Sequence, residues 1–111
     1  MKILYKSNKL EKSVKDAKSI IKNYGTRAKL VKQRLEEIKA AKSLADFKFL
    51  PKANCHELKG KRKEKLAIDV SANHRIIFFP NNDPLPQKDD GGLDWGQVLE
   101  ITIESIGEDY H

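Results

Sequence analysis

The chain has 111 residues, of which 39% are hydrophobic and 34% are charged. This length supports one core, so we expect a single domain over residues 1–111. No apolar run approaches the roughly 20 residues that a membrane-spanning helix needs, and neither a secretory signal nor a membrane partner is predicted. The one cysteine, Cys55, excludes an intramolecular disulfide and fits the reducing cytoplasm.

The net charge of +6 is unevenly distributed along the chain. Residues 1–75 carry 21 lysines and arginines against 8 acids, a balance of +13. Residues 76–111 carry Lys88 against 8 acids, a balance of −7. Basic charge of this density attracts polyphosphate, so the first part of the chain is either a nucleic-acid-binding surface or a solvated lysine-rich one.

The N-terminal region predicts a strand and then a helix. Residues 2–5 are a short apolar run typical of a first strand. Asn8 and Glu11 have the spacing of a capping box, in which both side chains bond free backbone amides. The apolar positions that follow at spacings of four and three lie on one helical stripe, which consists of Leu10, Val14, Ala17, Ile21 and Tyr24. Gly25 is expected to end this helix.

A second amphipathic helix is predicted directly after that glycine. Thr26 can cap it, and its apolar stripe consists of Ala28, Val31, Leu35 and Ile38. Because the turn between the two helices is so short, we expect them to form an antiparallel helical hairpin.

The period of the sequence changes after Pro51. Alternation over residues 66–70 predicts a half-buried strand. A turn at 71–73 joins it to an apolar strand over 75–79, and residues 98–106 alternate again. The order strand, helix, helix, strand, strand, strand predicts a small α+β domain, in which the helical hairpin covers one face of an antiparallel sheet.

Glycine-rich phosphate loops, zinc-binding spacings and serine-nucleophile motifs are not found, and no cofactor is predicted. The titratable candidates are the three histidines, His56, His74 and His111, which lie in the strand-rich half with lysines and arginines around them.

Three segments resemble the consecutive signatures of HigB-type toxins of the RelE/ParE superfamily, and they are His56–Gly60, Val70–Ile76 and Glu108–His111. In HigB toxins a histidine lies in a His-x-Leu-(Lys/Arg)-Gly segment on a strand, an arginine follows an Ala-Asn-aromatic turn, and the chain closes with Glu-Asp-Tyr-His. His74 departs from this pattern, because the family typically has an aromatic residue such as tryptophan there.

The resemblance implies the RelE-like ribonuclease fold and endonucleolytic cleavage of messenger RNA in the ribosomal A site. It also implies a HigA-like antitoxin with a helix-turn-helix domain, bound to the toxin in a hetero-oligomer. By matching positions, the active site would draw on His56, Arg75, Asp109, Tyr110 and His111, with Lys59 nearby as a backbone contact.

The chemistry of these residue types agrees with that activity. Metal-free RNA cleavage uses the 2′-hydroxyl as the nucleophile and needs a base, an acid and a cation. Histidine suits proton transfer because its unperturbed pKa is about 6.5, and the arginine fork suits phosphate oxygens. We expect His56 and His111 to be the proton-transfer pair, with the choice of acid and base open, and Arg75 to hold the phosphate. Asp109 can orient an imidazole or act as a base, and Tyr110 can orient or stack.

Two further segments are interpreted in the light of this activity. A basic hairpin turn is expected to contact ribosomal or messenger RNA, the alternative being a solvated turn, and it carries Lys59, Lys61, Arg62, Lys63 and Lys65. Residues 80–96 are rich in proline, glycine and aspartate, so we expect a loop that points away from the scissile phosphate. Trp95 is expected to anchor this loop to the body of the protein, the alternative being that it faces a partner.

Other functions stay open from the sequence. A ParE-like inhibitor of DNA gyrase would share the fold without needing the His56 segment or the terminal Asp-Tyr-His. A non-catalytic module that binds RNA or an antitoxin would tolerate the replacement of His56 or His111. For Cys55 as a nucleophile no partner base is evident, and a metal site drawn from Cys55, His56, His74 and His111 matches no zinc spacing.

Overall fold

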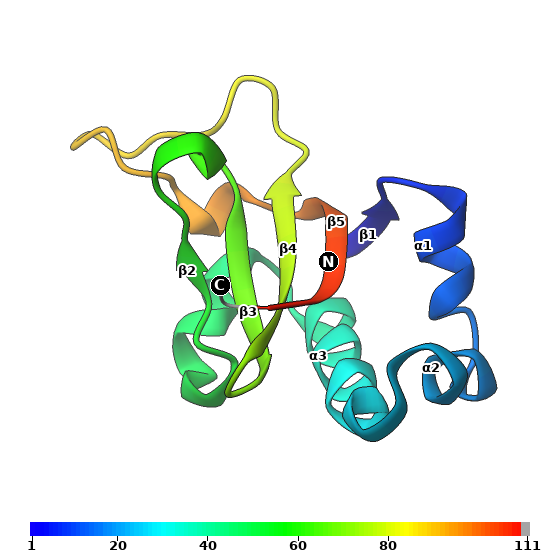
Figure 1. Ribbon diagram of the computed structural model, residues 1–111. Coiled ribbons are helices and arrows are strands. Elements are labelled where there is room, and N and C mark those ends of the chain that lie inside the picture. The colour runs from blue at the N-terminus through cyan, green and yellow to red at the C-terminus, as the bar shows by residue number, and fades with distance from the viewer. Residues whose placement is uncertain (110–111) are drawn as a thin grey trace.

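The computed structural model describes residues 1–109, with side chains as far as residue 107 (Figure 1). The strands are β1 (Lys2–Tyr5), β2 (His56–Glu57), β3 (Leu66–Ser71), β4 (His74–Pro80) and β5 (Glu100–Asp109). The α-helices are α1 (Asn8–Ser13), α2 (Ala17–Tyr24) and α3 (Ala28–Ala40). Short 3₁₀ helices connect them, namely η1 (Gly25–Arg27), η2 (Leu44–Phe49), η3 (Pro51–Ala53), η4 (Gly60–Arg62) and η5 (Trp95–Gln97). The predicted α+β class is confirmed.

The five strands form one sheet in the order β1-β5-β4-β3-β2. Every pairing is antiparallel except that of β1 with β5, which is parallel and places Ile3 beside Ile101. The last strand therefore returns beside the first and runs in the same direction. This pairing joins residues about a hundred positions apart, so the local periodicity of the sequence does not predict it.

The helix predicted over residues 10–24 is divided into two. The Asp16 side chain accepts a hydrogen bond of 2.7 Å from the backbone N–H of Ser19 and so begins α2 as a new helix. Ser7, rather than Asn8, caps α1. Gly25 ends α2 at φ 54°, as predicted. Thr26 lies within η1, and α3 begins without a side-chain cap.

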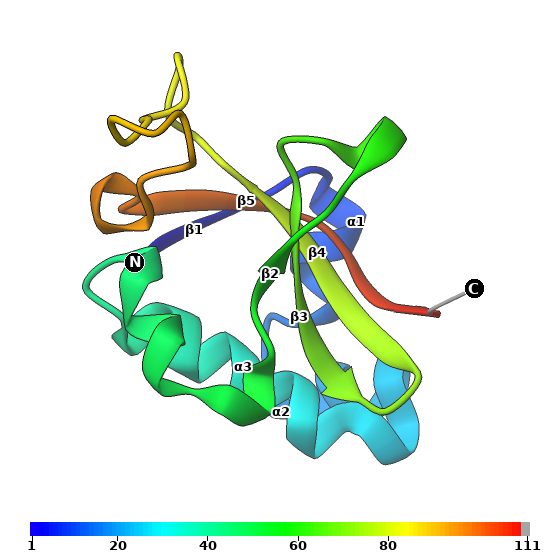
Figure 2. The ribbon, with the colours of Figure 1, turned by 90° about the vertical axis from the view of Figure 1, so that its left-hand side faces the viewer.

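Helix α3 covers one face of the sheet, as the hairpin prediction required. Figure 2 shows α3, η2 and η3 together on one side of the strands. The strand residues that face this side are at most 1% exposed, and they are Leu66, Ile68, Ile76, Phe78, Ile101 and Ile103. Against them pack the α3 side chains Val31, Leu35 and Ile38. We call this side the covered face.

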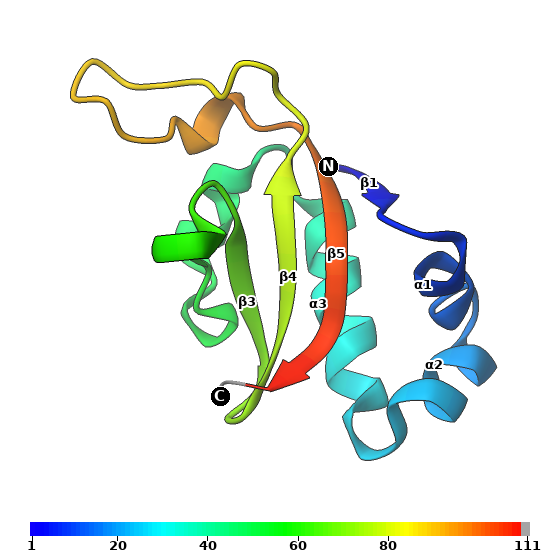
Figure 3. The same ribbon diagram turned by 45° about the horizontal axis from the view of Figure 1, so that its top comes forward.

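We call the opposite side of the sheet the open face, because no helix of the described residues lies across it. The two ends of the sheet differ (Figure 3). The loop between β4 and β5 projects from one end, and the turn between β3 and β4 lies at the other, beside the last residues of β5. None of the helices within residues 1–109 is long and apolar enough to cross a membrane.

The loop between β4 and β5 is anchored through Trp95, as predicted. The indole Nε1–H donates a 3.2 Å hydrogen bond to Glu57 Oε2 on β2, and the ring packs against the core. The Lys48 ammonium lies 5.7 Å from the centre of the ring, within the range of a cation–π contact.

Candidate active site

Strand register places His56 and Arg75 on the open face. His56 pairs with Ala67, which pairs with Ile77, and Arg75 pairs with Asp69 two residues further along β3. Directly paired residues share a face of a sheet, and so do residues two apart on one strand. The two Cα atoms are therefore two strands and two residues apart, or about 12 Å. Both side chains are long enough to reach one phosphodiester between them.

The imidazole of His56 is fixed by a backbone carbonyl. Its Nδ1 lies 2.7 Å from the carbonyl oxygen of Asn54, in a half-buried position at the start of β2. Because a carbonyl can only accept, Nδ1 carries the hydrogen and donates it. Nε2 of the neutral ring is then the nitrogen that can accept a proton.

Arg75 lies in the open-face row of β4, together with Ile77 and Phe79. Its side chain is half-buried and its Nε atom is buried. Its neighbours in the ladder are Asp69 on β3 and Glu108 on β5.

A bulge brings the end of β5 to Arg75. The register of β4 with β5 shifts between Arg75 and Ile76, and Gly107 adopts φ 79°, which a side chain would strain. The Arg27 guanidinium donates a 3.3 Å hydrogen bond to the Gly107 carbonyl. As a result β5 curves toward the β3–β4 turn, and the backbone of Asp109 pairs with His74 (Figure 3). Two predicted site residues, Tyr110 and His111, lie outside the described residues.

His74 does not join His56 on the open face. It precedes Arg75 directly on β4, so its side chain points to the opposite side of the sheet. Its Nδ1 lies 2.9 Å from the Ser71 hydroxyl oxygen, which ties it to the β3–β4 turn.

The predicted RNA-binding cations lie on the connection from β2 to β3, around η4. Lys59, Lys61 and Lys63 are exposed, whereas Arg62 and Lys65 are half-buried. This connection is at the end of the sheet away from Arg75. The five cations therefore extend from one end of the open face rather than surrounding the histidine.

Lys65 differs from the other cations because it is held by an acid. Its ammonium lies 2.6 Å from Glu104 Oε1, and Lys6 lies 3.5 Å from the same oxygen. The hydrogen bond from Lys65, with the charges of both lysines, lowers the pKa of the Glu104 carboxyl. The trio therefore links the residue before β3 and the residue after β1 to β5.

A cleft of about 700 Å³ lies between the basic turn and the β4–β5 loop. Its walls include Lys63, Lys65, Phe79, Asn82 and Gln87. The β4–β5 loop follows the end of β4 that is opposite to Arg75, and its Asp83 and Pro84 line this cleft together with Lys63 and Lys65 of the basic turn.

The surroundings of Cys55 support neither a nucleophilic role nor a role as a metal ligand. Burial raises the pKa of the thiol to about 12, so the thiol is protonated near neutral pH and is a poor nucleophile. Among the described residues, no group of three histidine, cysteine, aspartate or glutamate side chains is arranged to hold a metal ion.

Comparison with known proteins supports the fold. No protein-family model matches the sequence, and no curated protein matches it. Among solved structures, the chain is similar to one described as the YoeB/ParE toxin from Agrobacterium tumefaciens, with a TM-score of 0.51. The two align over 99% of this chain and 100% of that toxin at 12% sequence identity. The chain shares the fold of that toxin.

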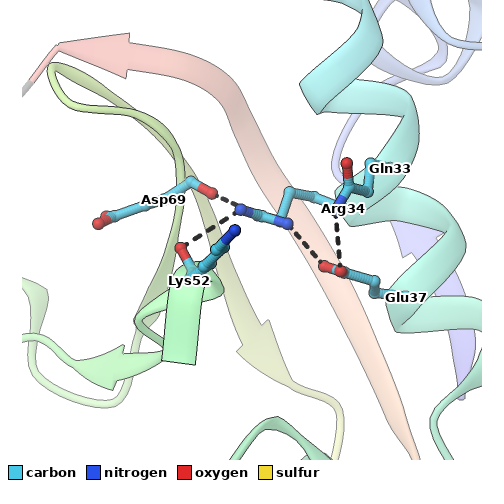
Figure 4. Close-up of polar contacts among 5 residues, drawn as sticks. All are labelled: Gln33, Arg34, Glu37, Lys52 and Asp69. Carbon is cyan, nitrogen blue, oxygen red and sulfur yellow. Dashed lines mark hydrogen bonds and ion pairs between the residues drawn. The ribbon is translucent and has the colours of Figure 1, made fainter. Parts of the chain in front are cut away.

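Two residues near the site did not emerge from the sequence. Arg34 of α3 is 5% exposed and donates hydrogen bonds to backbone carbonyls of both β3 and η3 (Figure 4). Asn54 holds His56 through its carbonyl and Asp69 through its side chain. A signal for Arg34 existed, since it lies three residues after Val31 and four before Ile38, on the buried stripe of its helix.

Proposed function

We propose that this protein is the toxin of a type II toxin–antitoxin system, of the HigB type, and that it cleaves messenger RNA on the ribosome. One observation carries the proposal. A histidine with a proton-accepting Nε2 and an arginine share the open face of a fold that is also the fold of a toxin. The basic turn at the end of the same face supplies charge that suits an RNA partner.

The chemistry follows from these groups. A base removes the proton of the RNA 2′-hydroxyl, whose oxygen bonds to the adjacent phosphorus. The bond from phosphorus to the 5′-oxygen breaks, and an acid protonates that oxygen. The products are a 2′,3′-cyclic phosphate and a 5′-hydroxyl. Arg75 supplies donors for the phosphate oxygens, on which negative charge grows in the transition state.

The C-terminal residues complete the proposed site. Strand β5 ends with the backbone of Asp109 paired to His74, the residue before Arg75 in β4. We assign proton transfer to His56 and His111, orientation of an imidazole to Asp109, and orientation or stacking to Tyr110. Lys59, Lys61, Arg62, Lys63 and Lys65 are assigned to RNA phosphates, and Lys65 also pairs with Glu104.

The proposal includes the partners and the setting. The substrate is messenger RNA in the A site of the 70S ribosome, and the toxin acts in the cytoplasm as one domain. A HigA-like antitoxin with a helix-turn-helix domain neutralises it in a hetero-oligomer. The steps above use side chains and the RNA itself, without a metal ion or cofactor.

Expression in bacteria tests the proposal. The 5′ ends of a reporter messenger RNA are mapped by primer extension after induction of the wild type, His56→Ala or His111→Ala. We expect new cleavages with the wild type that vanish in both variants and also when the reporter lacks a start codon. His74→Ala is the matched control, because this histidine faces the other side of the sheet, and it should still cleave.

The same cultures separate a ParE-like activity from cleavage. The name of the similar structure includes ParE, so inhibition of DNA gyrase is the second candidate. Growth arrest with gyrase-linked DNA breaks and intact reporter RNA would replace our proposal with that function. Unaffected growth and intact RNA would leave a non-catalytic binding module.

A further inference from the structure

Asn54, which fixes the His56 ring, is itself held on two sides. Its backbone is left-handed, with φ 46° and ψ 51°, directly after η3. Asparagine tolerates this conformation better than most residues. Its side-chain Nδ2 donates a 3.1 Å hydrogen bond to Asp69 Oδ2 on β3. The residue whose carbonyl accepts the hydrogen bond from His56 is therefore tied to β3, the strand that pairs with Arg75.

Arg34 of α3 connects β3 with η3, the segment before Asn54, from the covered face of the sheet (Figure 4). Its Nε donates a 2.7 Å hydrogen bond to the Asp69 carbonyl, and Nη2 donates one of 3.3 Å to the Lys52 carbonyl in η3. Its Nη1 lies 2.9 Å from Glu37 Oε1, one helical turn along α3. One planar guanidinium thus donates to three acceptors in fixed directions. The ammonium group of a lysine does not offer this geometry.

Burying the charged side chain of Arg34 under the sheet is energetically unfavourable. Arg34 is 5% exposed, and no other charged residue among those described is buried. Removing a charge from water is unfavourable, and an apolar side chain of similar volume commonly packs as well or better. An arginine here brings what an apolar residue would lack, namely a fixed distance between η3 and Asp69.

We propose that Asn54 and Arg34 are positioning residues, an inference that rests on the proposed function. Asn54 holds His56 as the Nδ1–H tautomer, so that Nε2 faces the RNA as the base that removes the 2′-hydroxyl proton. Arg34 holds the Asn54 segment against β3, which keeps His56 at a fixed distance from Arg75. The acid is then the other member of the proton-transfer pair, His111.

Nitrogen NMR of the histidine rings in the full chain tests the first step without any activity assay. At about pH 8, where histidine is neutral, His56 of the wild type should be mainly the Nδ1–H tautomer. Asn54→Gly keeps the left-handed backbone and removes only the bond to Asp69. In this variant we expect a shift toward the Nε2–H form that free histidine prefers. An unchanged tautomer in Asn54→Gly would overturn the role of Asn54.

A matched pair on α3 tests the second step. Arg34→Met with Glu37→Gln removes the clamp without leaving a buried charge, whereas Gln33→Ala alters a neighbour that bonds Glu37 but neither Asp69 nor Lys52. The clamp variant should show the same tautomer shift, and Gln33→Ala should not. If the clamp variant folds with the wild-type tautomer, the role of Arg34 is wrong. If it does not fold, Arg34→Lys is used, which keeps the charge but loses the fork.

Cleavage kinetics connect the two steps to the proposed function. In ribosome-dependent cleavage, Asn54→Gly should lower kcat about 10–100-fold, as losses of such supporting contacts commonly do, with KM nearly unchanged. The acidic limb of the pH–rate profile, which reports the base, should move with the tautomer population. Wild-type protein that has the predicted tautomer but cleaves no RNA would refute the proposed function and leave the positioning of His56 intact.

Discussion

The two faces of the sheet use the same strands for different purposes. On the covered face, Ile76 and Phe78 of β4 are at most 1% exposed and pack beneath α3. On the open face, Arg75 and Phe79 of the same strand are half-buried, and only Ala67 and Ile77 form a fully buried apolar floor. The covered face therefore contributes most of the apolar burial, and the open face carries the polar site. Because side chains alternate along a strand, neighbouring residues belong to different faces.

Neighbouring phenylalanines give the sharpest test of this division, and the largest expected effect. Phe78→Ala should lower the free energy of unfolding by about 3–5 kcal/mol, because it opens a cavity under α3. Phe79→Ala should cost clearly less, since its ring lies on the open face. Urea denaturation of both variants measures the difference, and equal losses would contradict the two-face description.

Arg75→Lys should damage cleavage while sparing the fold. Lysine keeps the positive charge but loses the fork that meets two phosphate oxygens. We expect kcat for ribosome-dependent cleavage to fall about 10²-fold or more, as when one such donor is removed. Circular dichroism and thermal melting should change little. Full activity would remove Arg75 from the site.

The Glu104 trio predicts a smaller, pH-dependent effect. Because Lys65 lowers the folded-state pKa of Glu104, this carboxylate adds stability above its ordinary pKa, about 4.5. That stability is lost as the pH falls through the lowered value. Glu104→Gln should therefore cost about 1 kcal/mol near neutral pH, and the difference from the wild type should disappear in acid. A constant difference down to the lowest pH at which the protein folds would exclude this coupling.

Cys55 gives the smallest expected effect. Since burial raises its pKa to about 12, the folded protein should react with iodoacetamide far more slowly than the urea-unfolded chain. Cys55→Ser should leave cleavage unchanged. Rapid labelling of the folded protein would show that the thiol is more accessible than its burial indicates.

The sequence predicted the elements in which side-chain periodicity is strong. Alternation located β3 and a continuous apolar run located β4, the α3 stripe was placed correctly, and Gly25 ended α2 as expected. The division between α1 and α2 was not predicted, because Asp16 starts α2 with one local hydrogen bond. The predicted stripe was wrong at Ile21, which is 64% exposed, whereas Ile20 is buried. The pairing of β1 with β5 joins residues far apart in sequence, so no local pattern shows it.

For the site, too, the sequence predicted some residues and missed others. His56 and Arg75 were selected from short motifs, and the register brings them to one face. The residues that hold them, Arg34 and Asn54, were not predicted. By residue type alone Arg34 is expected to be solvated, and only its place on the buried stripe of α3 indicates otherwise. Asn54 gives no sequence signal, because its role depends on a left-handed backbone and on two partners in the folded chain.

One measurement tests the central claim most directly. Purified protein is mixed with messenger RNA either free or bound to 70S ribosomes, and the products are separated on a sequencing gel. We predict cleavage to 5′-hydroxyl ends on ribosomes only, with a rate about 10²–10⁴-fold lower for His56→Ala, the range for a positioned proton-transfer group. Intact RNA under both conditions, or equal cleavage by wild type and His56→Ala, would contradict the account.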